Sequence, residues 1–302
     1  MTRVIDLEMH IPHSETDPSI EQMTKGRPGT PFPMSLPRPE GYGFANYGKV
    51  FGRPAKSGQA NASPVHQDGG LAELVQNMSK AGVERAFLLG AEHSRIREIH
   101  SKFPGKFVLP VLLNPLDGMR AVRELERLVK EEGAGALRVS ALYNLLPAND
   151  RRYYPLYAKC VELDIPVRIY TAMSYANDRP YDLGHPRCLD DIAVDFPELR
   201  IVAGLGGWPW INDMVALLRR HPNLYVDTAG HHPKYFAQAG SGWEQFLQFG
   251  NTLNQDKVMV GLSQYLFKVP LEQLVGDYLK LPLKDAVLEK WLHGNARTFF
   301  QF

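Results

Sequence analysis

The sequence predicts an α/β fold, a (β/α)8 TIM barrel with a long insertion after its first strand. From residue 70 onward, short apolar segments rich in Val, Ile and Leu alternate with segments of helical periodicity. Continuous apolar strands between helices are typical of a parallel sheet that is buried on both faces. Eight such strands in a chain of 302 residues favour a barrel.

A doubly wound open sheet is the competing architecture. It would need a glycine-rich nucleotide-binding turn after an early strand, and the sequence has no such turn. We therefore expect a single barrel domain over residues 1–302, with residues 11–69 as a loop or flap insertion.

The first predicted strand covers residues 4–10. Asp6, Glu8 and His10 share one parity in it, so we expect them on one face of the strand. A charged side chain that faces inward at the end of an apolar strand is costly to bury unless it pairs with another group or serves in a functional site. Glu8 and His10 are therefore expected at the C-terminal mouth of the barrel.

The insertion at residues 11–69 is rich in Pro, Gly and Ser and has little periodicity. A loop of this length in a compact domain is usually functional or disordered. Its aromatic residues favour a packed flap that covers the mouth or contacts a neighbouring subunit; they are Phe32, Tyr42, Phe44, Tyr47 and Phe51.

The remaining elements follow from the apolar pattern. Apolar residues recur at helical spacing at 71–82 and 117–132, and β-branched runs mark the strands. The predicted strands after the first are 85–89, 107–113, 135–140, 166–171, 199–204, 224–227 and 257–261. The predicted helices are 71–82, 94–103, 117–132, 151–163, 189–196, 211–220, 243–249, 271–278 and 284–300.

Composition restricts the class of function. The net charge is +1, with 34 basic and 33 acidic residues, which gives no indication of nucleic-acid binding. Cys160 and Cys188 form neither a disulfide framework nor a metal-binding pattern. The first twenty residues lack a secretion signal, and no apolar run reaches membrane length. We expect a cytoplasmic, soluble homo-oligomer that binds a small-molecule substrate.

In a barrel of this kind the active site lies at the C-terminal strand ends. Polar and aromatic residues at the predicted ends define the candidate site. They are Glu8, His10, Arg138, Arg168, Tyr170, Trp208, His232 and Gln264.

Four stretches at these ends resemble the amidohydrolase superfamily, in the branch of amidohydrolase-2-type hydrolases and aromatic-acid decarboxylases. The resemblance covers nearly the whole chain in the family's order. The stretches are Ile5-Asp6-Leu7-Glu8-Met9-His10; Phe196-Pro197-Glu198-Leu199-Arg200-Ile201-Val202 with Gly206-Gly207-Trp208-Pro209; Asn223-Leu224-Tyr225-Val226-Asp227-Thr228; and Val260-Gly261-Leu262-Ser263-Gln264-Tyr265 with Gly294-Asn295-Ala296-Arg297.

The resemblance implies a divalent metal bound through a His-x-His or Glu-x-His pair at strand one, and Glu8 and His10 match the second form. It also implies histidines after strands five and six and an aspartate after strand eight. This chain has Tyr170, Leu205 and Gln264 at those positions. Catalytic zinc sites usually have three protein ligands. We therefore expect no metal.

The alternative is zinc or manganese on Glu8 and His10, with His231 or His232 as an unusual third ligand. These two histidines follow strand seven, and because they are adjacent they point in different directions.

Without a metal, the expected catalytic residues are Glu8, His10, Tyr170 and Gln264. His10 can act as an acid or base near neutral pH, and Tyr170 and Gln264 can hydrogen-bond the substrate. The expected substrate-binding residues are Arg138, Arg168, Trp208 and His232, since arginine binds carboxylates bidentately. The structural alternatives are a buried ion pair between Glu8 and an arginine, and a packing role for the aromatic residues.

Three functions follow from this reading. The first is a metal-independent hydrolase acting on a small cyclic or aromatic substrate that carries a carboxylate or a lactone. The second is a metal-dependent aromatic-acid decarboxylase. The third is a catalytically inactive relative that binds a ligand or a partner subunit.

Overall fold

The computed structural model of the protein describes residues 2–12 and 70–302. Of the predicted insertion, only Ile11 and Pro12 belong to the described residues. The predicted flap over the barrel mouth therefore lies outside them.

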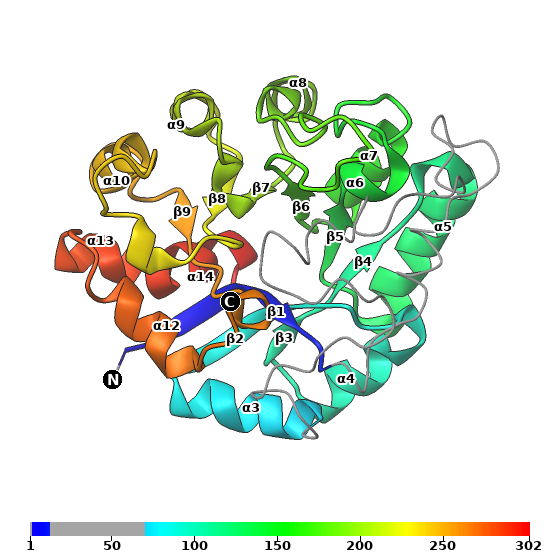
Figure 1. Ribbon diagram of the computed structural model, residues 1–302. Helices are drawn as coiled ribbons and strands as arrows, with labels where there is room; N and C mark the ends of the chain where they lie inside the picture. The colour runs from blue at the N-terminus through cyan, green and yellow to red at the C-terminus, as the bar shows by residue number, and fades with distance from the viewer. Residues whose placement is uncertain (1, 13–69) are drawn as a thin grey trace.

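The strands are parallel and follow one another in chain order around the centre of the molecule (Figure 1). One sheet contains β1 (Val4–His10), β2 (Val83–Leu89) and β3 (Phe107–Val108). The other contains β4 (Pro110–Leu112), β5 (Ala136–Val139), β6 (Val167–Tyr170), β7 (Ile201–Gly204), β8 (Leu224–Asp227) and β9 (Val258–Met259).

The two sheets belong to one cycle of strands. Only Leu109 separates β3 from β4, so this pair corresponds to the single strand predicted at 107–113. At the other junction, the backbone N–H of Leu7 donates a hydrogen bond to the carbonyl oxygen of Val260 at 2.9 Å, which places β1 beside the end of β9. The predicted TIM-barrel fold is confirmed.

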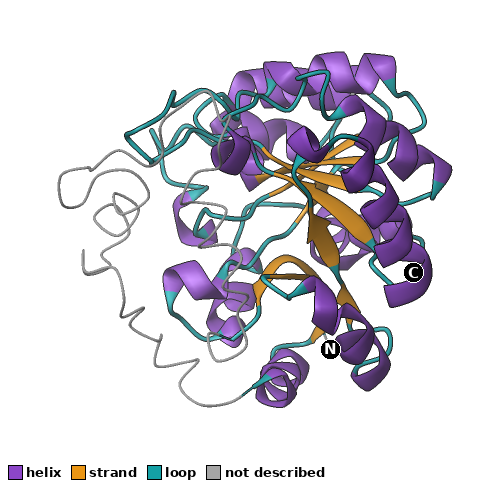
Figure 2. Cartoon of the chain, turned by 90° about the vertical axis from the view of Figure 1, so that its right-hand side faces the viewer, coloured by secondary structure: helices purple, strands orange, loops and turns teal. Residues whose placement is uncertain are grey.

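Helices surround the strands on the outside (Figure 2). No helix among the described residues is both long and apolar enough to cross a membrane. The α-helices are α3 (Leu71–Lys80), α4 (Ile96–Lys102), α5 (Met119–Arg127), α6 (Ala141–Asn144), α7 (Tyr154–Glu162), α8 (Arg187–Asp195), α9 (Ile211–Arg220), α10 (Glu244–Gly250), α11 (Gln264–Phe267), α12 (Leu271–Tyr278), α13 (Asp285–Glu289) and α14 (Asn295–Phe300).

Several predicted helices are interrupted. The helix predicted at 117–132 is a 3-10 turn (Pro115–Asp117), then α5, then a π-helical turn (Leu128–Glu132). Gly118 has φ 55°, a left-handed conformation that a continuing helix cannot contain. The helix predicted at 284–300 contains a π-helical turn between α13 and α14 (Lys290–Gly294). The short helices α6 and α11 were not predicted, since four residues are too few to show periodicity.

Side chains alternate between the barrel interior and the helical layer. On β6, Val167 and Ile169 belong to the large apolar cluster shared with the helices, whereas Arg168 and Tyr170 line the pocket at the strand ends. A smaller apolar cluster, which includes Phe87, Val202 and Met259, fills the interior together with Phe299 of α14. This alternation directs polar side chains to one end of the interior.

β1 departs from simple alternation. Its pairing with β2 shifts register between Asp6 and Met9, because three residues on β1 oppose two on β2. Before this irregularity, Ile5 and Leu7 pack in the smaller apolar cluster, and after it, Glu8 and His10 line the pocket. Asp6 therefore does not share a pocket face with Glu8 and His10, and the parity prediction fails for this residue.

Asp6 instead connects the first strand to the last. Its Oδ1 accepts hydrogen bonds from the backbone N–H of Glu8 at 3.0 Å and of Leu262 at 2.7 Å. Burial raises the pKa of Asp6 from 3.8 to about 7, although the two backbone hydrogen bonds act in the opposite direction. The neutral carboxyl group is therefore the form that the fold favours.

The substitution Asp6→Asn tests this. A folded-state pKa above the unfolded value stabilises the protein at low pH, and this stabilisation is lost as the pH rises from about 4 to about 7. We expect wild-type stability to fall across this range by up to roughly 4 kcal/mol relative to Asp6→Asn. Urea unfolding at several pH values measures the difference.

Asp6→Ala is the matched control. It removes the acceptor for both backbone N–H groups, so it should cost about 1–3 kcal/mol even at low pH. Parallel stability curves for the wild type and Asp6→Asn would contradict a neutral Asp6.

Candidate functional site

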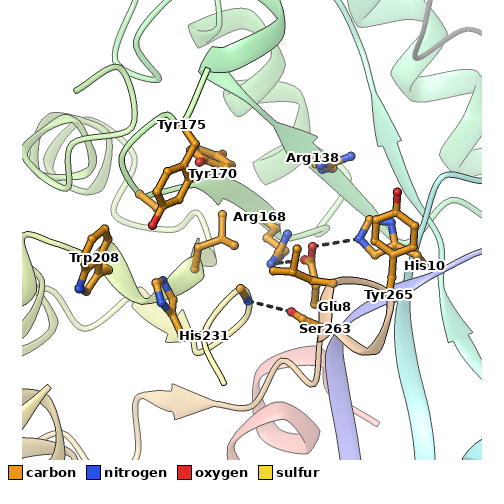
Figure 3. Close-up of a pocket in the computed structure, with 14 residues that line it drawn as sticks. Glu8, His10, Arg138, Arg168, Tyr170, Tyr175, Trp208, His231, Ser263 and Tyr265 are labelled. Atoms are coloured by element: carbon orange, nitrogen blue, oxygen red, sulfur yellow. Dashed lines mark hydrogen bonds and ion pairs between the residues drawn. The ribbon is translucent and has the colours of Figure 1, made fainter. Parts of the chain in front are cut away.

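The C-terminal strand ends enclose a cavity of about 190 Å³ (Figure 3). Its walls come from β1, β5 and β6 and from the segments that follow β6, β7, β8 and β9. The lining residues are Glu8, His10, Arg138, Arg168, Tyr170, Ala172, Tyr175, Leu205, Trp208, Gly230, His231, Ser263, Tyr265 and Leu266.

Arg168 connects two carboxylates, Glu8 on β1 and Asp227 on β8. Its Nη2 lies 2.6 Å from Glu8 Oε2, and its Nε donates a hydrogen bond to Asp227 Oδ2 at 2.7 Å. The arginine is only 3% exposed and Asp227 is fully buried. Coulombic attraction is strong in such a dry environment, and it raises the pKa of Arg168 against the effect of burial.

Glu8 is held in its ionised form. Burial alone would raise its pKa, but attraction to Arg168 and a hydrogen bond with His10 together lower the pKa from 4.5 to about 2. His10 Nε2 lies 3.1 Å from Glu8 Oε1. An ionised carboxylate only accepts hydrogen bonds, so this contact assigns the imidazole proton to Nε2 and leaves the lone pair on Nδ1.

His10 is also fixed by stacking. The ring of Tyr265 lies 4.7 Å from the His10 ring, centroid to centroid, with an interplanar angle of 22°. Glu8 and Tyr265 together restrict the rotation of the imidazole. A general acid or base works best when its orientation is fixed in this way.

Besides its ion pair with Arg168, Asp227 accepts hydrogen bonds that fix the turn after β7. Its Oδ1 accepts hydrogen bonds from the backbone N–H of Leu205 at 2.9 Å and of Ala229 at 3.0 Å. Leu205 has φ 74°, which is rare for a branched side chain and indicates a strained turn. Burial raises the pKa of Asp227, while attraction to Arg168 opposes that rise.

Arg138 is the neighbour of Arg168 in the sheet. The two residues are register partners on β5 and β6, and like charges in that arrangement repel. Glu8 interacts electrostatically with both guanidinium groups, since Arg138 also contributes to the lowered pKa of Glu8. The side chain of Arg138 lies over the Tyr143 ring at 5.9 Å. Because Arg138 lines the cavity, its positive charge is available to an anion there.

Aromatic residues form the other side of the cavity (Figure 3). The rings of Tyr175 and Trp208 are stacked with centroids 6.4 Å apart and an interplanar angle of 14°. His231 lies 5.9 Å from Trp208, ring to ring. Burial lowers the pKa of His231 from 6.5 to about 4, so its imidazole is neutral at physiological pH. This side suits a planar ring.

Six of the predicted site residues line this one cavity: Glu8, His10, Arg138, Arg168, Tyr170 and Trp208. The Tyr170 hydroxyl donates a hydrogen bond to the Met173 carbonyl at 2.8 Å, so part of its hydrogen-bonding capacity is already used.

Gln264 and His232 are not among the lining residues. Gln264 is buried at the start of α11. His232 Nδ1 accepts a hydrogen bond from the backbone N–H of Lys234 at 3.4 Å and caps a 3-10 turn, whereas the adjacent His231 points into the cavity.

Three further residues line the cavity without having been predicted as site residues: Tyr175, Ser263 and Tyr265. Ser263 Oγ accepts a hydrogen bond from the backbone N–H of Gly230 at 2.8 Å and joins the turns after β8 and β9. Position after a predicted strand was the available signal for Ser263 and Tyr265. Tyr175 lies in the longer segment between β6 and α8, where strand position gives no guide.

The donor set does not fit a divalent metal. Among residues 2–12 and 70–302, no group of three or more His, Cys, Asp or Glu side chains is arranged to hold an ion. Glu8 Oε2 already faces the Arg168 guanidinium at 2.6 Å, and Leu205 contributes an apolar side chain to the lining. A metal ion beside Glu8 would have to displace that guanidinium.

A family model described as amidohydrolase matches residues 5–302. No curated protein matches the chain significantly. Among solved structures, an uncharacterized TIM-barrel protein of Bordetella bronchiseptica has a TM-score of 0.72 and 22% identity, covering 99% of this chain and 98% of that one.

Two further solved structures are decarboxylases. The 5-carboxyvanillate decarboxylase of Novosphingobium aromaticivorans, complexed with manganese and a nitrobenzoic acid, has a TM-score of 0.68 and 16% identity, covering 100% of this chain and 96% of that one. The 2,6-dihydroxybenzoate decarboxylase of Rhizobium has a TM-score of 0.64 and 14% identity, covering 100% of this chain and 99% of that one. These similarities show the fold.

The substitution Arg168→Ala tests the central ion pairs. It leaves the carboxylates of Glu8 and Asp227 buried without their cation, and we expect a loss of about 3–5 kcal/mol in the free energy of unfolding. Arg120→Ala is the matched control, because its pairing with Asp117 is on the surface, and it should cost less than about 1 kcal/mol. If urea unfolding shows the same loss in the free energy of unfolding for Arg168→Ala and Arg120→Ala, the role of Arg168 is contradicted.

Proposed function

Because the chain belongs to the amidohydrolase family, we propose that it is a metal-independent hydrolase of small cyclic or aromatic substrates that carry a carboxylate or a lactone. The observation that carries this proposal is the ionised Glu8 beside His10, in the same cavity as the available charge of Arg138. Together they provide a base, an orienting carboxylate and an anion-binding group.

The cavity size supports a substrate with one ring. A cavity of roughly 150 Å³ accommodates benzene, and this one measures about 190 Å³. The stacked Tyr175 and Trp208 provide a flat wall for such a ring. Arg138 would bind the substrate carboxylate through paired N–H groups.

In the proposed reaction, Nδ1 of His10 accepts a proton from water as the water oxygen attacks the substrate carbonyl carbon. Glu8 stabilises the imidazolium that results, because it stays ionised. The carbonyl C–O bond to the leaving oxygen then breaks, and His10 returns its proton to that oxygen. The products are a carboxylic acid and an alcohol.

The pairing of Arg138 with a carboxylate favours hydrolysis over decarboxylation. During decarboxylation the C–C bond to the carboxylate breaks, its electron pair moves to the carbon that remains, and the carboxylate loses its negative charge as it becomes CO2. A guanidinium bound to that carboxylate stabilises the ground state more than the transition state and slows the reaction. During hydrolysis elsewhere on the molecule the same contact serves only to orient the substrate.

An aromatic-acid decarboxylase is the second candidate, because solved structures with this fold include such enzymes. Its metal-dependent form would require a cation beside Glu8, where the Arg168 guanidinium lies at 2.6 Å.

A substrate screen distinguishes these candidates. Purified protein is tested against small aromatic acids, cyclic carboxylates and lactones, with CO2 release and acid release recorded separately. We expect acid release that persists after treatment with a chelator. His10→Gln should lower kcat by roughly 100- to 10,000-fold with little change in KM. CO2 release that a chelator abolishes and manganese restores would establish the decarboxylase.

Arg138 is tested through substrate charge. Arg138→Met should raise KM for a carboxylated substrate roughly 10- to 100-fold, because a charge-assisted hydrogen-bond pair is lost. The neutral methyl ester of the same substrate should bind the wild type and the variant equally. Arg123→Met, at an exposed position on α5, is the control and should leave KM unchanged. A similar rise in KM for the carboxylated substrate and its methyl ester would refute carboxylate binding by Arg138.

A further inference from the structure

Two buried carboxylates from distant parts of the chain share one cation in this protein. Glu8 is on β1 and Asp227 on β8, and their oxygens lie 2.6 Å and 2.7 Å from nitrogen atoms of Arg168. The side chain of Glu8 is 12% exposed and that of Asp227 is fully buried. Two such charges cannot remain buried close together without a positive group between them.

Neighbouring residues leave space for the Arg168 guanidinium and contact it. A Cβ atom on Gly204, the last residue of β7, would lie 3.0 Å from Arg168 Cζ and 3.1 Å from Nη2. Only glycine therefore leaves the full space that the guanidinium occupies beside β7. On another side, Arg168 Cζ lies 5.7 Å from the centre of the Phe87 ring. These contacts fix the cation in the interior of the barrel.

From this arrangement we infer that Arg168 is a built-in substitute for a divalent cation, and that Glu8 and Asp227 form a latent metal site which the guanidinium fills. The wild-type protein excludes metal from this position because the arginine is covalently attached and cannot be displaced at ordinary ion concentrations. Removing the guanidinium leaves the two carboxylates of Glu8 and Asp227 without a cation. These two side chains alone are the proposed ligands, since no group of three His, Cys, Asp or Glu side chains among residues 2–12 and 70–302 is arranged to hold an ion.

Manganese(II) is the appropriate probe. Carboxylate oxygens are hard ligands that suit Mn²⁺. The inference does not depend on the proposed hydrolysis, since it concerns only what balances the charge of Glu8 and Asp227. Its test uses metal content and thermal stability, so it can fail or succeed whichever reaction the protein catalyses.

The first measurement uses the wild type. The full chain is incubated with MnCl2, freed of unbound metal by gel filtration and analysed for manganese. We expect a content far below one ion per chain and no change in Tm when Mn²⁺ is added. One tightly bound manganese per wild-type chain that disappears in Glu8→Gln would overturn the inference.

The second measurement uses Arg168→Ala. We expect about one manganese per chain and a rise in Tm of roughly 5 °C in excess Mn²⁺, because a ligand that binds only the folded state stabilises it. The double variant E8Q/R168A should lose both effects, and Arg120→Ala should behave like the wild type. A folded Arg168→Ala variant without manganese binding would overturn the inference.

A variant that does not fold in the absence of metal still gives a result. Arg168→Ala is then refolded from denaturant in parallel with MnCl2 and with a chelator. A higher yield of folded monomer or oligomer with manganese supports the latent site, and equal yields contradict it. The E8Q/R168A variant, treated identically, should show no dependence on manganese.

Discussion

The ion pairs of Arg168 with Glu8 and Asp227 hold the functional end of this barrel together. They connect β6 to β1 and β8, and they neutralise charges that the interior could not otherwise contain. Asp227 in turn fixes the strained turn at Leu205. The position of the turn after β7, and with it the Trp208 side of the cavity, therefore depends on the same cation.

This arrangement gives the neighbouring residues separate tasks. Glu8 stays ionised because Arg168 is beside it, so it can orient His10 and does not itself exchange protons near neutral pH. Arg138, the register partner of Arg168 on β5, lines the cavity. Of the two arginines on these adjacent strands, Arg168 is therefore engaged in buried ion pairs, whereas Arg138 is the one we propose for substrate binding.

Much of the fold could be predicted from the sequence, because strands buried on both faces give continuous apolar runs such as Ala86 to Leu89. The position of the cavity followed from the topology, and the structure places Glu8, His10, Arg138 and Arg168 in its lining, while their roles stay predictions. Other features depend on contacts between distant residues. The register shift in β1 arises from pairing with β2, and the sequence of β1 alone shows only even alternation.

The partners of Arg168 are another such feature. In the sequence, Asp227 is only one residue of a stretch that resembles the family. The strand order, in which β7 lies between β6 and β8, is needed to show that Asp227 shares this arginine with Glu8. The choice between His231 and His232 likewise depends on how the segment after β8 turns, which local composition does not determine.

The most direct measurement of the central claim is an anomalous difference map from a crystal soaked in MnCl2 and recorded at the manganese absorption edge. The account predicts planar guanidinium density between Glu8 and Asp227 and no anomalous peak there. A strong manganese peak in contact with Glu8 and His10, with the Arg168 side chain displaced, would contradict it.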